Sequence, residues 1–160
     1  MLNPGELFRR YYYHRKLKTP KKIEELIVKK ILDAPTDSIM IVHWHYAVRR
    51  PLGYIPQIKF SSLKRLAESR KIERTILLSV EAPASFISKR RMSDSHKKKR
   101  ALSILTIREE ARQDKIFLAK HHALFSRILG KNKVTISRLI NKDLRTAQSN
   151  LYRFFRKLLG

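Results

Sequence analysis

Hydrophobic and polar positions follow a helical period through most of the chain. Phe60, Leu63, Leu66 and Ala67 recur on one face and predict a helix between residues 57 and 71. A shorter helix is expected from Asn3-Pro4-Gly5-Glu6, where a cap residue precedes a proline. Residues 21–30 predict another helix, or a segment that passes directly into a strand. Two apolar stripes near the end predict two more helices: Phe117, His121, Leu124, Phe125 and Ile128, then Ala147, Leu151, Phe154, Phe155 and Leu158.

Other segments have the composition of strands. Residues 38–48 are rich in β-branched and aromatic side chains, and residues 74–80 form a short apolar run. A brief run at residues 31–34 precedes a turn at residues 35–37, and residues 49–53 form a loop. The order strand, turn, strand, helix, strand predicts a small α/β domain over residues 1–112, followed by a basic helical extension over residues 113–160. A mostly α-helical fold is the alternative.

The charge of the chain indicates the kind of partner that it binds. The 160 residues contain 37 Lys and Arg against 13 Asp and Glu, a formal net charge of +24. A compact fold with this charge repels itself unless a polyanion neutralises it, and nucleic acid supplies one negative charge per phosphate. We see no apolar run long enough to span a bilayer, so no membrane partner is expected. The sequence therefore predicts a nucleic-acid-binding protein.

Catalytic and cofactor chemistry has little support in the residues. The chain contains no cysteine, which excludes disulfides and thiolate metal sites, and only four glycines, which leaves no glycine-rich phosphate loop. No nucleophile with a base and an orienting acid is evident. We expect a protein that is not an enzyme and holds no cofactor or metal.

The candidate phosphate contacts are clusters of basic residues. They are Lys89, Arg90, Arg91, Lys97, Lys98, Lys99 and Arg100 in the middle, Arg9, Arg10, Arg15 and Lys16 near the start, and Arg145, Arg153, Arg156 and Lys157 near the end. The tyrosines at 11–13 lie among the first of these charges, where they could stack on bases or face the core. Both readings stay open.

Two further patterns are candidates for function. His43 and His45 alternate on a predicted strand, so both rings face one side, but without a third ligand a structural or phosphate-contacting role is favoured over a metal. Residues 135–153 resemble a helix-turn-helix whose second helix, ending in 151–158, would read DNA. Arg145 stands where that turn usually has glycine.

The middle of the chain also resembles the RecB-like nucleases of CRISPR adaptation, which have the PD-(D/E)xK fold. Tyr11-Tyr12-Tyr13-His14-Arg15-Lys16 is similar to their N-terminal motif, Lys30-Ile31-Leu32-Asp33-Ala34 to their Gly-x-x-Asp-Ala element, and Gln57 to the start of their next helix. The strand that should carry Glu-x-Lys reads His43-Trp44-His45. The resemblance covers residues 8–112 and implies a degenerate PD-(D/E)xK-like sheet with flanking helices.

The departures from this family imply lost cleavage. Asp33 alone remains of the metal-binding carboxylates, and His43 and His45 occupy the Glu and Lys positions. An inactivated nuclease of this kind is similar to the basic nucleocapsid proteins of filamentous archaeal viruses of the Thermoproteus tenax type. That resemblance implies a non-catalytic protein that coats double-stranded DNA in the virion or host cytoplasm, with self-association or a second coat protein as partner.

Three rival hypotheses remain at this stage. A helix-turn-helix transcription regulator would prefer one DNA sequence, and an organellar ribosomal protein would prefer folded RNA. A live nuclease requires Asp33, His43 and His45 to bind a metal together.

Overall fold

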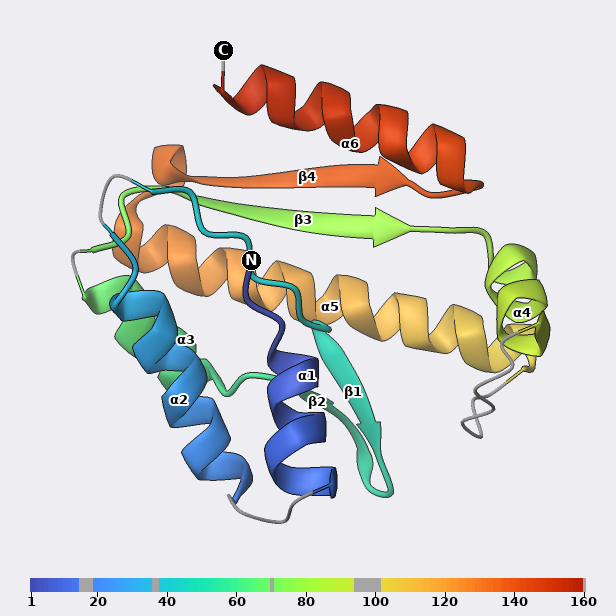
Figure 1. Ribbon diagram of the computed structural model, residues 1–160, viewed down its shortest axis with the longest axis horizontal. Coiled ribbons are helices and arrows are strands. Elements are labelled where there is room, and N and C mark those ends of the chain that lie inside the picture. The colour runs from blue at the N-terminus through green and yellow to red at the C-terminus, as the bar shows by residue number, and fades with distance from the viewer. Residues whose placement is uncertain (15–18, 36–37, 70, 94–101, 160) are drawn as a thin grey trace.

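The computed structural model describes residues 1–14, 19–35, 38–69, 71–93 and 102–159, which form a mixed α/β fold (Figure 1). The helices are α1 (Pro4–Phe8), α2 (Pro20–Leu32), α3 (Phe60–Glu68), α4 (Ala84–Ser93), α5 (Ile104–Leu129) and α6 (Leu144–Leu159), with a π-helical segment at Arg9–His14 and a 3-10 turn at Lys131–Lys133. The strands are β1 (Ala47–Arg50), β2 (Gly53–Pro56), β3 (Thr75–Glu81) and β4 (Val134–Ile140).

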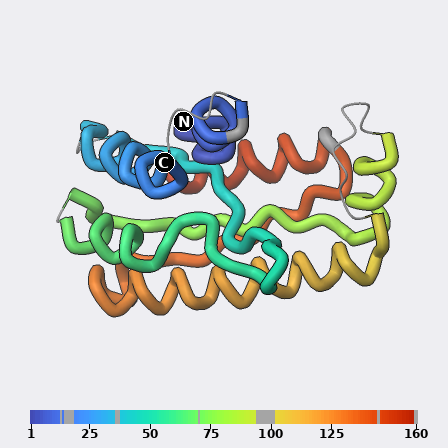
Figure 2. The backbone as a smooth tube through the Cα atoms, turned by 90° about the horizontal axis from the view of Figure 1, so that it is seen from below, coloured from blue at the N-terminus to red at the C-terminus, as the bar shows by residue number. Residues whose placement is uncertain are grey.

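The strands form two small sheets. β1 and β2 make an antiparallel hairpin whose turn passes through Gly53 at φ 121°, a conformation that favours glycine. β3 and β4 pair in parallel, with Leu77 opposite Ile136, and α4 and α5 make the connection between them. α5 lies on one face of this parallel sheet and α6 on the other, together with α1 and α2 (Figures 1 and 2). The layers cover both faces only in part, because Val80 of β3 and Ile136 and Ile140 of β4 remain exposed.

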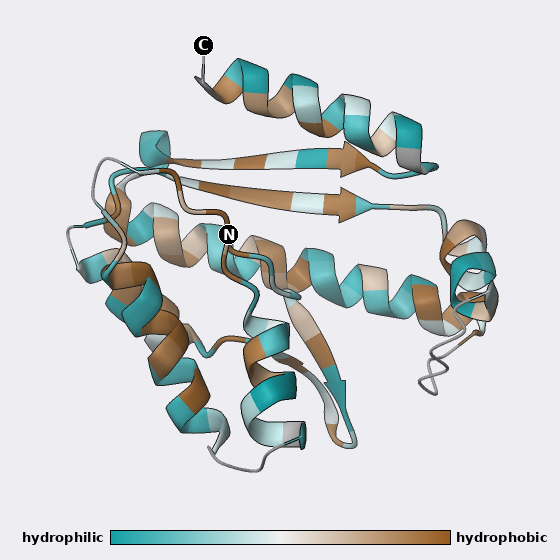
Figure 3. Ribbon diagram, in the orientation of Figure 1, coloured by the Kyte–Doolittle hydropathy of each residue, from teal (hydrophilic) through white to brown (hydrophobic). Residues whose placement is uncertain are grey.

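The core lies where α2, α3 and α5 meet the parallel sheet. Ile23, Ile27 and Leu63 are fully buried, and Leu77 of β3 and Val134 of β4 join them. In Figure 3 hydrophobic and hydrophilic residues alternate along α2 and α5, as expected for helices with one buried side. Burial of these side chains is the main stabilising contribution, about 1.5–3 kcal/mol for each large aliphatic residue.

Several predicted helices are confirmed. α3 buries Leu63, Leu66 and Ala67 on the expected face, although it begins at Phe60 and not at Gln57. α2 and the second half of α5 lie where the helical period places them. The Asn3 side chain caps α1 by accepting a hydrogen bond from the Glu6 N–H at 3.2 Å.

The predicted helix-turn-helix is wrong. Residues 134–140 form β4, which pairs with β3 along its whole length, so the first helix of that motif does not exist. The physical reason is local: Val134, Thr135, Ile136 and Ile140 are β-branched and favour extended backbone. The C-terminal region is therefore not wholly helical, and α6 is a single helix packed on a sheet.

The strand predicted at residues 38–48 is mostly an extended segment, and among the described residues its one β-bridge before Ala47 joins Val42 to Leu2. Its backbone bonds there are made with Leu2, which donates to the Ile41 carbonyl and accepts from the His43 N–H. The regular strand begins only at Ala47, because the turn at residues 51–52 sets the hairpin register. The run at residues 31–34 is not a strand either, since it ends α2 with Asp33 as the C-cap.

The proposed boundary at residue 112 falls inside α5. Residues on both sides of it share one core, because β4 pairs with β3 and Phe125 packs in the same cluster as Leu77. Among the described helices, none is long and apolar enough to cross a membrane.

Candidate nucleic-acid interface

The start of α6 is fixed by three side-chain hydrogen bonds. The Asp143 carboxylate accepts from the Thr146 N–H at 2.8 Å and from the Thr146 hydroxyl at 2.7 Å, and these bonds hold the pKa of Asp143 below its usual value. Asn150 donates to the Ile140 carbonyl at 3.3 Å, which ties the second turn of α6 to the end of β4. The helix is thus held at its N-terminal end, where an acidic cap also matches the helix dipole.

The outward face of α6 carries arginines and one tyrosine. Arg145, Tyr152 and Arg156 lie at spacings of seven and four residues, so they share a face, and Arg153 lies beside them. All four are exposed, Tyr152 to 68%. Arg153, Arg156 and Lys157 form no ion pair with any described residue. We refer to Arg145, Tyr152, Arg153 and Arg156 as the α6 basic face.

The basic residues of α4 are used mainly inside the fold. Arg90 donates from Nη2 to the carbonyls of Asn141 and Lys142 and to Oδ1 of Asn141, at 3.1–3.3 Å, and so fixes the turn before α6. Arg91 pairs with Glu110 of α5 at 2.7 Å, and both side chains are mostly buried. Lys89 is exposed. Of these three predicted phosphate contacts, Lys89 has the most accessible charge.

The other predicted contacts lie apart from α6. Arg9 and Arg10 are exposed on the π-helical segment that follows α1, well away from α6 in Figure 1. The Arg10 guanidinium lies 5.5 Å from the centre of the Tyr11 ring. Arg15, Lys16, Lys97, Lys98, Lys99 and Arg100 lie outside the described residues. The structure therefore gathers one predicted cluster, on α6, but does not bring the N-terminal cluster to it.

The residues matched to the nuclease motif are either exposed to solvent or hydrogen-bonded to the backbone. Asp33 is exposed at the end of α2, and its N–H donates to the Lys29 carbonyl at 2.8 Å. His43 and His45 are exposed with ring centres 6.3 Å apart, on one side of an extended segment as expected. Gln57 accepts the His45 N–H at 2.6 Å. In the part of the chain that the structure describes, no three His, Asp or Glu side chains lie close enough together to hold a metal ion.

Several carboxylates that the sequence did not single out hold the backbone together. The buried Glu24 accepts the Lys59 N–H at 2.8 Å, at the start of α3. Asp114 of α5 accepts the Ala47 N–H at 2.9 Å, at the start of the hairpin, and burial raises its pKa. Burial, with Asp114 nearby, raises the pKa of Tyr46 to about 12. These carboxylates stabilise the fold and do not screen the charge of the α6 basic face.

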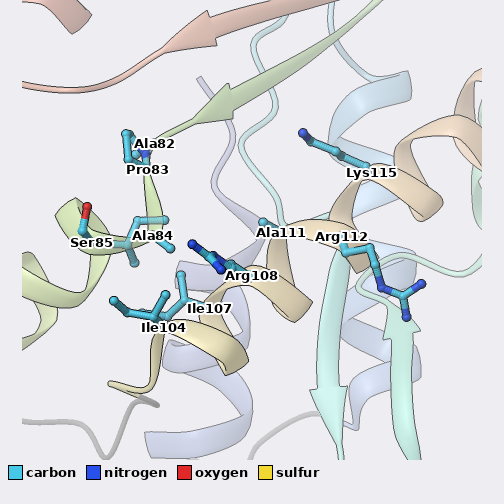
Figure 4. Close-up of a pocket in the computed structure, with 11 residues that line it drawn as sticks. Ala82, Pro83, Ala84, Ser85, Ile104, Ile107, Arg108, Ala111, Arg112 and Lys115 are labelled. Atoms are coloured by element: carbon cyan, nitrogen blue, oxygen red, sulfur yellow. The ribbon is translucent and has the colours of Figure 1, made fainter.

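A solvent-open cavity of about 570 Å³ lies between the β3–α4 connection and α5, and most of its lining residues are exposed (Figure 4). One wall is formed by Ala82, Pro83, Ala84 and Ser85, and the other by α5 residues that include Ile107, Arg108 and Lys115. This cavity is not among the sites that the sequence predicts. The available signal was the spacing of Arg108, Arg112 and Lys115, which places three cations on one helix face away from the apolar stripe.

No protein-family model matches the chain, and no curated protein is similar to it in sequence. The functional argument therefore rests on the residues and their placement.

Proposed function

We propose that this protein binds double-stranded DNA without reading its sequence, and that it coats or packages the DNA. The observation that supports this most is the α6 basic face, where Arg145, Arg153 and Arg156 are exposed on a helix anchored to the sheet. Arginine binds phosphate through a rigid fork of donors, and Tyr152 adds a flat surface that can lie along the backbone. With a formal net charge of +24, phosphate contacts would dominate the affinity.

Sequence-independent binding follows from how α6 is held. In a helix-turn-helix the preceding helix positions the recognition helix in the major groove, whereas α6 follows a strand, β4, and packs on it. Without the first helix of a helix-turn-helix, the transcription-regulator hypothesis loses its structural basis.

The nuclease ancestry and the coat function remain part of this proposal. A non-catalytic role is supported by the exposed positions of Asp33, His43 and His45, which do not converge. We propose a coat protein in the virion or host cytoplasm that assembles with copies of itself or with a second coat protein. Such a protein would need the positive charge of the degenerate nuclease fold and not its catalytic residues.

The test is fluorescence-anisotropy titration of unrelated duplexes and a structured RNA over a range of salt concentrations. The variant combines Arg145→Gln, Arg153→Gln and Arg156→Gln. The control combines Lys21→Gln, Lys22→Gln and Lys29→Gln, which removes the same charge from exposed positions of α2. If α6 contacts phosphates, its variant should lower the slope of log affinity against log salt by about 2 to 3, because each lost phosphate contact removes about 0.9. The control should leave the slope nearly unchanged.

Other outcomes would point elsewhere. Equal effects of the two triple variants would show that charge acts only at long range and would refute the α6 contact. A strong preference for one duplex would refute sequence-independent binding. Clear preference for the structured RNA would favour the ribosomal alternative.

A further inference from the structure

The cavity between the β3–α4 connection and α5 combines an apolar lining with a cationic rim. Ala82, Pro83 and Ala84 face Ile104, Ile107 and Ala111 across it, all small or aliphatic. Its volume of about 570 Å³ is within the range of small-molecule sites, roughly 300–1,000 Å³. An aromatic ring system of a ligand would fit against the part of the lining that these six residues form, because none of them carries a charge.

The rim differs from the lining because it carries charge. Arg108 and Lys115 are seven residues apart on α5, about 10 Å along the helix axis, and both line the cavity. Figure 4 shows the Arg108 side chain pointing toward Ala84, whereas Arg112 points away from the cavity. The guanidinium of Arg112 is held by Glu109 at 2.8 and 2.9 Å, but Arg108 forms no ion pair with the residues described.

The local charge favours an anion. Lys115 approaches Glu81 at 3.2 Å, and Arg138 of β4 approaches the same carboxylate at 3.8 Å. Three cations (Arg108, Lys115 and Arg138) thus lie near one carboxylate, that of Glu81, which leaves an excess of two positive charges. A phosphate monoester carries about −1.5 to −2 at neutral pH and would balance them.

We propose that this cavity binds a nucleoside monophosphate, with the base against the apolar lining and the phosphate on Arg108 and Lys115. This site is independent of the α6 basic face. The Ser85 hydroxyl is the polar side-chain group on the apolar wall, and it makes no hydrogen bond with a described residue. One hydroxyl cannot distinguish four bases, so we expect weak base selectivity, with purines favoured by their larger apolar area.

Isothermal titration calorimetry with adenosine monophosphate, adenosine and inorganic phosphate at low salt tests the site. Arg108→Gln should weaken binding of the nucleotide about tenfold, because it removes a charge-assisted contact. Arg127→Gln is the matched control, an exposed arginine of the same helix outside the cavity, and should change affinity less than about twofold. Ala111→Phe fills the cavity from an exposed helix position and should weaken the nucleotide about tenfold while leaving inorganic phosphate unchanged.

The results separate this site from general charge attraction and from duplex binding. Nucleotide affinity that is equal in the wild type, Arg108→Gln and Ala111→Phe would overturn the proposal. Duplex binding should survive Ala111→Phe, so loss of one activity does not imply loss of the other. The nucleotide has two possible sources, a free molecule or the end of a DNA strand. If strand ends are bound, a hairpin DNA with a 5′-phosphate should compete with adenosine monophosphate better than its unphosphorylated form; equal competition assigns the site to the free nucleotide.

Discussion

Protonation of His121 should destabilise this protein as the pH falls below 6.5. The imidazole is fully buried, and neither ring nitrogen has a hydrogen-bond partner among the described residues. It packs between the Tyr46 ring, with centres 5.4 Å apart, and the Phe60 ring, at 5.3 Å. Burial in these surroundings lowers the pKa of His121 to about 4, because the charged form cannot be solvated there.

The magnitude follows from linkage. Above pH 6.5 the ring is neutral in both the folded and the unfolded chain, so it adds no pH dependence. Between pH 6.5 and about 4 the unfolded chain binds a proton that the folded protein excludes, and the free energy of unfolding therefore decreases. A shift of this size corresponds to about 3 kcal/mol at 1.36 kcal/mol for each pKa unit.

The assay is guanidinium unfolding at pH 7.5 and pH 4.0, comparing the wild type with His121→Leu. Carboxylates titrate in both proteins, so their contribution cancels in the difference between the two pH responses. The wild type should lose about 3 kcal/mol more than the variant over this range. At pH 7.5 the variant should be as stable as the wild type or more so, since it removes two unpaired polar atoms from a buried site.

A neighbouring histidine provides the control. His122 is partly exposed and lies 3.4 Å from the Ser126 hydroxyl, so His122→Gln should retain the pH response of the wild type. Equal loss of stability in wild type and His121→Leu between pH 7.5 and 4.0 would refute the reasoning, because it would mean that the folded protein accepts the proton without penalty.

Two further predictions concern residues around α4 and α6. Arg91→Ala should lower the free energy of unfolding by about 1–3 kcal/mol, because it leaves the largely buried Glu110 unpaired, whereas Lys89→Ala should change stability by less than about 0.5 kcal/mol; thermal unfolding of both variants checks this, and equal stabilities would contradict it. Asp143→Ala should lower stability by removing the cap of α6, and hydrogen exchange should quicken first at the start of that helix; unchanged exchange there would show that the cap is dispensable.

The helices of the core could be predicted from the sequence because their apolar residues recur on one face. Leu63, Leu66 and Ala67 are buried on α3, and Phe117, His121 and Phe125 are buried on α5, as their spacing indicates. His121 belongs to the predicted apolar stripe, and its burial follows from that position. Burial on one side of a helix depends on local period, and a single sequence contains that information.

Pairing between strands was much harder to predict. The sequence predicts a helix at β4, because the strong stripe on α6 and the basic composition dominate the C-terminal region. Signals for a strand are present as well. Gly130, with φ 97°, ends α5, and the β-branched residues Val134, Thr135 and Ile136 follow. The opposite error occurred at residues 38–46, where apolar side chains such as Ile39 remain exposed because no strand lies beside them. A strand requires a partner, and the partner of β4 is more than fifty residues away.

Composition located the charge but could not say which cations are free. Arg90 and Arg91 belong to one basic run with Lys89, yet each of the two arginines is committed to a neighbouring element. Arg108 is the opposite case, because it lies outside the basic clusters of the sequence and yet lines the cavity. It reaches the cavity because α4 and α5 pack together. Which positive charge can meet a phosphate is decided by the positions of the acids and carbonyl groups, and these come from tertiary contacts.

The placement of the acids separates stability from binding in this protein. Glu24, Glu110 and Asp114 each hold a backbone N–H or a mostly buried arginine, and Asp143 caps α6. Because these carboxylates satisfy interior groups, little negative charge is left to oppose the α6 basic face. Loss of one of them should therefore reduce stability before it changes affinity for a polyanion, whereas loss of the α6 arginines should do the opposite. In this chain, with its excess of positive charge, these four acids stabilise interior groups and one helix end, and the repulsion that remains is what a polyanion would relieve.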